Sequence, residues 1–179
     1  MTPKNYFMTY GVGLHKDKLI SFEFALRKAG IAEYNLVGVS SILPPRCEKI
    51  SMEAGKAKLT PGQIIFCVLS RNETNEAERV LCAAVGVATP EDISQYGYIA
   101  ELHMFGKTEI ESKDWVEDRA AELLGSTLGI EIDWQKAWDE KTDTYTIKDR
   151  KVDTESVCAY GKGVDGSWVS AVAAVVFIE

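Results

Sequence analysis

Two adjacent hydroxyl residues, Ser40 and Ser41, lie where the character of the chain changes abruptly. Residues 36–39 before them are mostly apolar or β-branched, which is typical of a β-strand. Pro44 and Pro45 follow closely, and proline lacks a backbone N–H and pushes the residue before it toward an extended conformation. We therefore expect the serine pair at the point where a buried strand becomes a stiff, non-helical segment.

The serine pair has two interpretations. On the pair alone, a hydrogen-bonding site at a strand end is favoured. In the other, the Ser41 hydroxyl attacks the Ser40 carbonyl carbon through a five-membered ring and forms an ester. β-Elimination and hydrolysis would then leave a pyruvoyl group in place of Ser41, and the chain as two pieces, 1–40 and 41–179. This reaction requires strain at the scissile bond and hydrogen-bond donors for the developing oxyanion.

The surrounding segment resembles the processing site of pyruvoyl-dependent arginine decarboxylases. The similarity is carried by Asn35-Leu36-Val37-x-Val39-Ser40-Ser41-Ile42-x-Pro44-Pro45 and continues in residues 19–31 and 97–101. It implies a self-processing carboxy-lyase of polyamine biosynthesis that converts L-arginine to agmatine and CO₂. The covalent pyruvate made from Ser41 would be its cofactor, forming a Schiff base with the substrate and accepting electrons as CO₂ leaves.

Two other functions stay open. Another basic amino acid could be the substrate. Alternatively, the chain could be an unprocessed, non-catalytic homologue that serves as a binding or assembly protein.

The resemblance assigns Glu101 as the proton donor. In a strand, Glu101 shares one face with Ile99, His103 and Phe105, because side chains alternate. Apolar neighbours would raise its carboxyl pKa by desolvation, which suits a general acid. The alternative is a solvated Glu101 paired with a lysine. His103 could tune Glu101 but is left outside the predicted site, as is His15 in a polar loop.

The residues that the resemblance assigns to binding the substrate side chain lie on one helix. Glu23 falls where the family usually has an aspartate that holds the guanidinium, and a carboxylate can bind that group bidentately. Because glutamate is one methylene longer than aspartate, the substrate could be a shorter cation, or arginine could bind in a shifted position. Alternatively, Glu23 does not bind substrate and forms a surface pair with Arg27. Leu19 and Leu26 would pack against the aliphatic stem of the substrate. Alternatively, both side chains only pack the helix against the protein core. Ser40, the new C-terminus, would line the pocket.

Asn35 belongs to the same motif, but it lies far from Ser41 along the chain. Six strand residues span roughly 20 Å, so Asn35 cannot touch its own Ser41 in a straight strand. Either the strand bends sharply or Asn35 serves an adjacent subunit; a third reading is an amide that satisfies a strand end. The family forms trimers, so we predict a homotrimer of αβ protomers with active sites at subunit interfaces.

The elements that position these residues read as an α+β fold. We expect strands at 6–12, 34–41, 63–70, 79–88, 95–105, 143–147, 155–159 and 168–178. Helices are expected from Asp17 to Ala29, with an apolar stripe at Leu19, Phe22, Leu26 and Ala29, and from Ser112 to about residue 128. We expect turns at Gly11/Gly13, 71–75, 148–154 and 161–166, and a loop at 46–60. The resemblance implies a four-layer αββα sandwich, with two central β-sheets flanked by helices.

Composition limits the function classes. The 179 residues fit a single domain, and the net charge of −7 argues against nucleic acid as a partner. Four widely spaced cysteines and two histidines predict reduced thiols and no metal site. Without a signal peptide or a long apolar run, we expect a cytoplasmic protein that does not bind a membrane.

Overall fold

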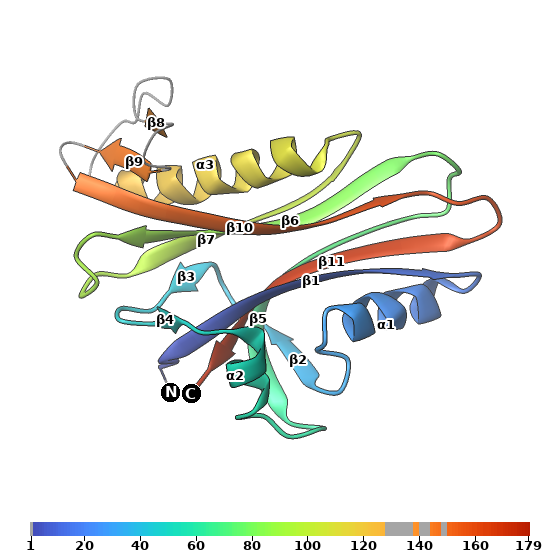
Figure 1. The fold of residues 1–179 in the computed structure, drawn as a ribbon, viewed down its shortest axis with the longest axis horizontal. Coiled ribbons are helices and arrows are strands. Elements are labelled where there is room, and N and C mark those ends of the chain that lie inside the picture. The colour runs from blue at the N-terminus through green and yellow to red at the C-terminus, as the bar shows by residue number, and fades with distance from the viewer. Residues whose placement is uncertain (1, 128–137, 140–143, 148–149) are drawn as a thin grey trace.

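The computed structural model describes residues 2–127, 138–139, 144–147 and 150–179. Two β-sheets lie face to face, and helices cover both outer faces (Figure 1). The predicted α+β class, with two central sheets flanked by helices, is confirmed.

The first sheet is mixed and has five strands. Their order across the sheet is β2 (Asn35–Gly38), β5 (Ile64–Thr74), β11 (Trp168–Ile178), β1 (Asn5–His15) and β4 (Glu48–Lys49). The three long strands β5, β11 and β1 are antiparallel neighbours, whereas β2 is parallel to β5 and β4 to β1. Helices α1 (Lys18–Lys28) and α2 (Met52–Lys56) lie on the outer face (Figure 1).

The second sheet has six described strands, all antiparallel. Their order is β3 (Ile42–Leu43), β7 (Gly97–Phe105), β6 (Val80–Pro90), β10 (Arg150–Lys162), β9 (Thr144–Ile147) and β8 (Trp138–Asp139). Helix α3 (Glu109–Thr127) covers its outer face (Figure 1). Because β3 is only two residues long, it pairs with just the first two residues of β7.

Three apolar layers hold the sandwich together, as expected when each element buries one face. The layer between the sheets includes Val68, Val85, Val87, Ile99, Val175 and Phe177. The layer under α1 includes Phe7, Ala25, Ile31, Val172 and Val176. The layer under α3 includes Ala84, Leu102, Val116, Ala120 and Leu124.

Strand β1 runs straight through the two glycines that predicted a turn, so that prediction is wrong. A Cβ on Gly11 would overlap the Ala25 carbonyl oxygen, and one on Gly13 would overlap the Ser21 carbonyl oxygen. The glycines therefore allow the α1 backbone to lie directly against β1.

The boundaries of α1 are confirmed. The Asp17 carboxylate accepts a hydrogen bond from the Ile20 N–H at 3.1 Å, which caps the helix start. Beyond its end, Gly30 has a φ of 72°, and the N–H of buried Ile31 donates to the Leu26 carbonyl. The predicted apolar stripe is only partly right, because the Leu19 side chain is 73% exposed.

Several other predicted boundaries are wrong. The predicted strand 34–41 stops at Gly38, and most of β2 is exposed rather than buried. The expected loop 46–60 contains β4 and α2, and most of the expected turn 71–75 belongs to β5. Strand β10 runs from 150 to 162, so it absorbs parts of both turns predicted around it. Helix α3 is capped by Thr108 rather than Ser112.

The strands predicted at 63–70, 79–88, 95–105 and 168–178 are confirmed, with small shifts at their ends. Strand β8 was not predicted. The predicted helix end at 128, strand start at 143 and turn residues 148–149 lie outside the described residues.

Candidate active site

The chain crosses from the first sheet to the second between β2 and β3 (Figure 1). Ser40 and Ser41 lie in this crossing segment. Just before the pair, the Val39 N–H donates to the Cys67 carbonyl of β5 at 3.0 Å. At the pair, the Ser41 carbonyl accepts from the Ile99 N–H of β7 at 2.9 Å. The Ser40–Ser41 peptide bond is thus flanked by two hydrogen bonds, one to a strand of each sheet.

The carbonyl of this peptide bond has its own donor. The Ile42 N–H lies 2.9 Å from the Ser40 carbonyl oxygen and donates to it, which closes a three-residue turn. Neither serine has a positive φ; among the described non-glycine residues, only Arg46 and Glu78 do. The hydrogen-bond requirement for cleavage is therefore met, whereas left-handed backbone strain is not found at the pair.

An apolar hollow of about 430 Å³ opens beside the pair. It is lined by Pro3, Val39, Ser40, Ile42, Pro44, Pro45, Phe66 and Phe177. The side chains of Val39 and Ile42 are 38% and 40% exposed in the single chain. The serine pair therefore borders apolar surface rather than a charged loop.

Glu101 lies near the serine pair. Since Ile99 binds the Ser41 carbonyl, Glu101 is two residues further along the same face of β7, about 7 Å along the strand. Ile99 is buried, but Glu101 is exposed and the Phe105 side chain is 41% exposed. The apolar enclosure expected around Glu101 is thus absent in the single chain. Among the described ion pairs, none joins Glu101 to a lysine.

The residues assigned to the substrate side chain lie on α1, on the outer face of the first sheet. Glu23 accepts a hydrogen bond from the Arg27 Nε at 2.9 Å, so the alternative surface pair is present in the single chain. Leu26 packs in the layer under α1, whereas Leu19 is exposed. Glu23 and Arg27 border a second hollow of about 380 Å³, together with Glu33 and Lys56.

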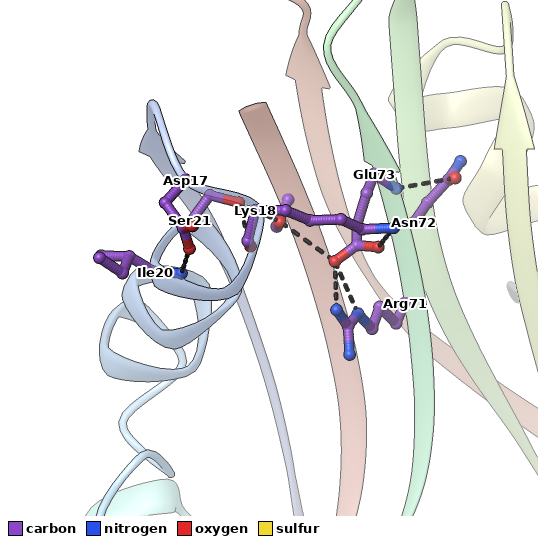
Figure 2. Close-up of polar contacts among 8 residues, drawn as sticks. Asp17, Lys18, Ile20, Ser21, Arg71, Asn72 and Glu73 are labelled. Carbon is purple, nitrogen blue, oxygen red and sulfur yellow. Dashed lines mark hydrogen bonds and ion pairs between the residues drawn. The ribbon is translucent and has the colours of Figure 1, made fainter. Parts of the chain in front are cut away.

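The first turn of α1 is anchored to the first sheet by a polar cluster (Figure 2). Ser21 and Ser170 share a hydrogen bond between their hydroxyls at 2.7 Å. Glu73 binds Lys18 Nζ at 3.0 Å and Arg71 Nε at 2.8 Å. Burial works to raise the Glu73 pKa, but the hydrogen bonds from Arg71 and Lys18 outweigh it and hold the pKa below its usual range. The cluster fixes the N-terminal end of α1, next to Leu19 and one turn or more before Glu23.

Asn35 lies at the start of β2, six residues before Ser41. Its side-chain amide donates to the Gly62 carbonyl at 2.7 Å, and its backbone N–H donates to the Gln63 carbonyl. The structure therefore brings Ser40, Ser41 and Glu101 together, but it leaves Asn35 at the other end of β2 and Glu23 on α1.

Comparisons with known proteins match this chain over nearly its full length. The family described as pyruvoyl-dependent arginine decarboxylase (PvlArgDC) matches residues 5–179. The pyruvoyl-dependent arginine decarboxylase 2 of Methanosarcina mazei is 49% identical, covering 99% of this chain and 98% of its own. A pyruvoyl-dependent arginine decarboxylase of Methanococcoides burtonii is 48% identical, with 99% of both chains covered. A probable member from Chlorobium phaeovibrioides is 47% identical over 98% of this chain and 97% of its own.

The chain belongs to the pyruvoyl-dependent arginine decarboxylase family. The predictions of this family, of a carboxy-lyase and of a covalently bound pyruvoyl cofactor are confirmed. The serine pair fits the cofactor, because a decarboxylase of this kind needs a serine whose hydroxyl can reach the preceding carbonyl and a donor on that carbonyl. Both conditions are met at Ser41, whose preceding carbonyl is bound by the Ile42 N–H.

The backbone partners of the serine pair in this decarboxylase could not be read from the sequence. The Ile42 and Ile99 N–H groups and the Cys67 carbonyl are main-chain groups, so no residue type signals them. All four cysteines are buried, and none is paired in a disulfide. No helix in the described part of the chain is long and apolar enough to span a membrane.

Proposed function

We propose that the chain cleaves itself between Ser40 and Ser41 into fragments 1–40 and 41–179, and then decarboxylates L-arginine to agmatine and CO₂. The observation that carries the proposal is the Ser40–Ser41 peptide bond, which spans the two sheets with a donor on its carbonyl and Glu101 nearby. Family membership supplies the reaction class.

The proposed cleavage balances without an oxidant. The Ser41 hydroxyl oxygen bonds to the Ser40 carbonyl carbon, the peptide C–N bond breaks, and the hydroxyl proton passes to the Ser41 nitrogen. Loss of the Ser41 α-proton expels the ester oxygen, which becomes part of the Ser40 carboxylate. Water then replaces the nitrogen of the remaining dehydroalanine, which leaves as ammonia.

The pyruvoyl group formed from Ser41 supplies a carbonyl that takes up the electron pair left by departing CO₂. Glu101 then delivers a proton to the substrate Cα. The Glu23 carboxylate binds the guanidinium in place of Arg27, and Leu19 and Leu26 pack the aliphatic stem. Ser40, as the new C-terminus, lines the pocket together with Asn35.

We propose that these residues meet in a homotrimer of αβ protomers, with active sites at subunit interfaces. The supporting observation is the separation, within one chain, of Ser41 and Glu101 from Asn35 and α1. The apolar hollow beside Ser40 and the exposed side chains of Val39 and Ile42 provide surface that a second copy could cover. The protein is proposed to act in the cytoplasm, where its free thiols stay reduced.

The alternative substrate is another basic amino acid, since Glu23 is one methylene longer than the usual aspartate. Release of CO₂ from L-arginine, L-lysine and L-ornithine separates the possibilities. We expect arginine to have the highest kcat/KM, Glu23→Asp to keep this order, and Glu23→Ala to raise KM for arginine. Faster turnover of lysine or ornithine would contradict arginine as the substrate. A full-length chain that releases no CO₂ would identify an inert homologue.

A further inference from the structure

The turn at residues 40–42 singles out one backbone group. We infer that the backbone N–H of Ile42 is the oxyanion donor for self-cleavage, an inference that rests on the cleavage proposed at Ser40–Ser41. When the Ser41 hydroxyl adds to the Ser40 carbonyl carbon, the negative charge develops on the Ser40 carbonyl oxygen. The Ile42 N–H already lies 2.9 Å from that oxygen before any reaction.

The pairing of β3 explains why this N–H is available. In an antiparallel ladder, the hydrogen-bonding groups of successive residues point to opposite sides of the strand. Next to Ile42, the Ser41 carbonyl points toward β7 and accepts from the Ile99 N–H. The Ile42 N–H points away from β7 and donates to the Ser40 carbonyl instead. This donor is therefore separate from the ladder that holds β3 in the second sheet.

The neighbouring contacts keep the donor and acceptor aligned. Val39 is bound to β5 and Ser41 to β7, so the peptide bond cannot rotate freely between them. A fixed donor needs no reorganisation when the charge appears, and a hydrogen bond to an oxyanion is stronger than one to a neutral carbonyl. Removing a single oxyanion donor typically slows a reaction about 10²–10³-fold.

The side chain of Ile42 can be varied independently of its N–H. It is 40% exposed and lines the apolar hollow beside Ser40, so trimming it leaves the buried layers intact. Ile42→Pro removes the N–H, and proline is tolerated on a short edge strand when its nitrogen faces away from the ladder. Ile42→Val and Ile42→Ala keep the N–H and serve as matched controls.

The test follows cleavage itself, by denaturing electrophoresis of freshly made precursor over time. We expect the Val and Ala variants to cleave at a rate close to the parent, and Ile42→Pro to cleave about 10²-fold more slowly. Hydroxylamine, which cleaves esters, should release no additional fragment from Ile42→Pro, because the defect precedes the ester. Cleavage of folded Ile42→Pro at the parental rate, or accumulation of ester in it, would overturn the inference.

A second variant covers the possibility that Ile42→Pro does not fold. Replacing residue 42 by the α-hydroxy acid analogue of isoleucine exchanges only the N–H for an oxygen and keeps the side chain. This ester-backbone variant should also cleave about 10²-fold more slowly, and parental cleavage would overturn the inference. If the parent and both N–H-retaining controls stay whole, the proposed cleavage fails, and the inference with it.

Discussion

Glu101 and His103 lie on the same face of β7, yet only Glu101 is assigned a proton transfer. Glu101 is two residues from the Ile99 that binds Ser41, whereas His103 is four residues away. A strand advances about 3.3 Å per residue, so His103 lies roughly twice as far from the reacting atoms. Position along the strand therefore decides between the two side chains, because both are exposed in the single chain.

Glu101→Gln should separate cleavage from decarboxylation. The carboxamide has nearly the same size but cannot donate the proton, so kcat for CO₂ release should fall about 10²–10⁴-fold. The two fragments should still form, since Ser41 and the Ile42 N–H are unchanged. His103→Gln is the control on the same face and should keep near-parental kcat. Equal losses in the two variants would argue against Glu101 as the donor.

Among the elements, α1 depends on the glycines of β1. A Cβ on Gly13 would overlap the Ser21 backbone, which cannot move aside by changing a rotamer. Gly13→Ala should therefore lower the free energy of unfolding by about 3 kcal/mol or more, measured by urea denaturation.

Gly62→Ala is the comparison for Gly13→Ala. Gly62 has a φ of 82°, and nothing lies within 4 Å of an added Cβ, so only the backbone conformation is strained. Gly62→Ala should therefore lower the free energy of unfolding by about 1–2 kcal/mol. A Gly13→Ala protein as stable as Gly62→Ala would mean that the contact between α1 and β1 is not as close as described.

The anchor of α1 at Glu73 should make stability depend on pH. Hydrogen bonds hold the Glu73 pKa below its usual range in the folded state. The stabilisation is therefore present above the ordinary glutamate pKa of about 4.3 and is lost as the pH falls through the folded-state pKa. Glu73→Gln should be less stable than the parent by roughly 1–3 kcal/mol at pH 7.

The pH series provides the check on Glu73. Urea midpoints of the parent and Glu73→Gln should begin to converge below the ordinary glutamate pKa of about 4.3. They should meet only when the pH falls below the lowered folded-state pKa of Glu73, where the parent carboxylate becomes protonated. Glu76→Gln, at an exposed surface pair with Arg79, is the control and should change stability little at any pH. If the stability difference between the parent and Glu73→Gln stayed constant with pH, the negative charge of Glu73 would not be the source of the stabilisation.

The sequence predicted elements well where one pattern continued without interruption. The apolar strand ending in Ile178 and the helix capped by Asp17 were found, because burial and capping leave direct residue signals. Prediction from the sequence failed where tertiary contacts override the local preference of the residues. Gly13 resembles a turn residue but serves close packing, and Arg71 and Glu73 resemble a turn but pair with each other along β5.

The residues of the candidate site were predictable from the sequence, but their path between the two sheets was not. Ser40, Ser41 and Glu101 were named from the family motif, and the structure brings them to one edge of the sandwich. The crossing between sheets was not predicted, because local periodicity cannot reveal that Val39 and Ser41 pair with different sheets.

For the whole molecule, the separation of Asn35 from Ser41 predicts complementation between subunits. Asn35→Ala and Ser41→Ala should each be inactive as pure proteins. In trimers that contain both variants, roughly one of the three sites should regain activity if neighbouring subunits of a cyclic trimer complete each site, because only one neighbouring pair then joins an intact Ser41 to an intact Asn35. Arginine decarboxylation by the mixed trimers, isolated with two different affinity tags, measures this. No recovery in mixed trimers would mean that Asn35 and Ser41 serve the same subunit's site.

The most direct measurement is the intact mass of active, purified protein beside the Ser41→Ala variant. We expect two fragments, 1–40 and 41–179, with the larger lighter than its serine-terminated form by the mass of ammonia. Ser41→Ala should remain one chain and release no CO₂ from arginine. A full-length, unmodified chain that decarboxylates arginine would contradict a cofactor made from Ser41.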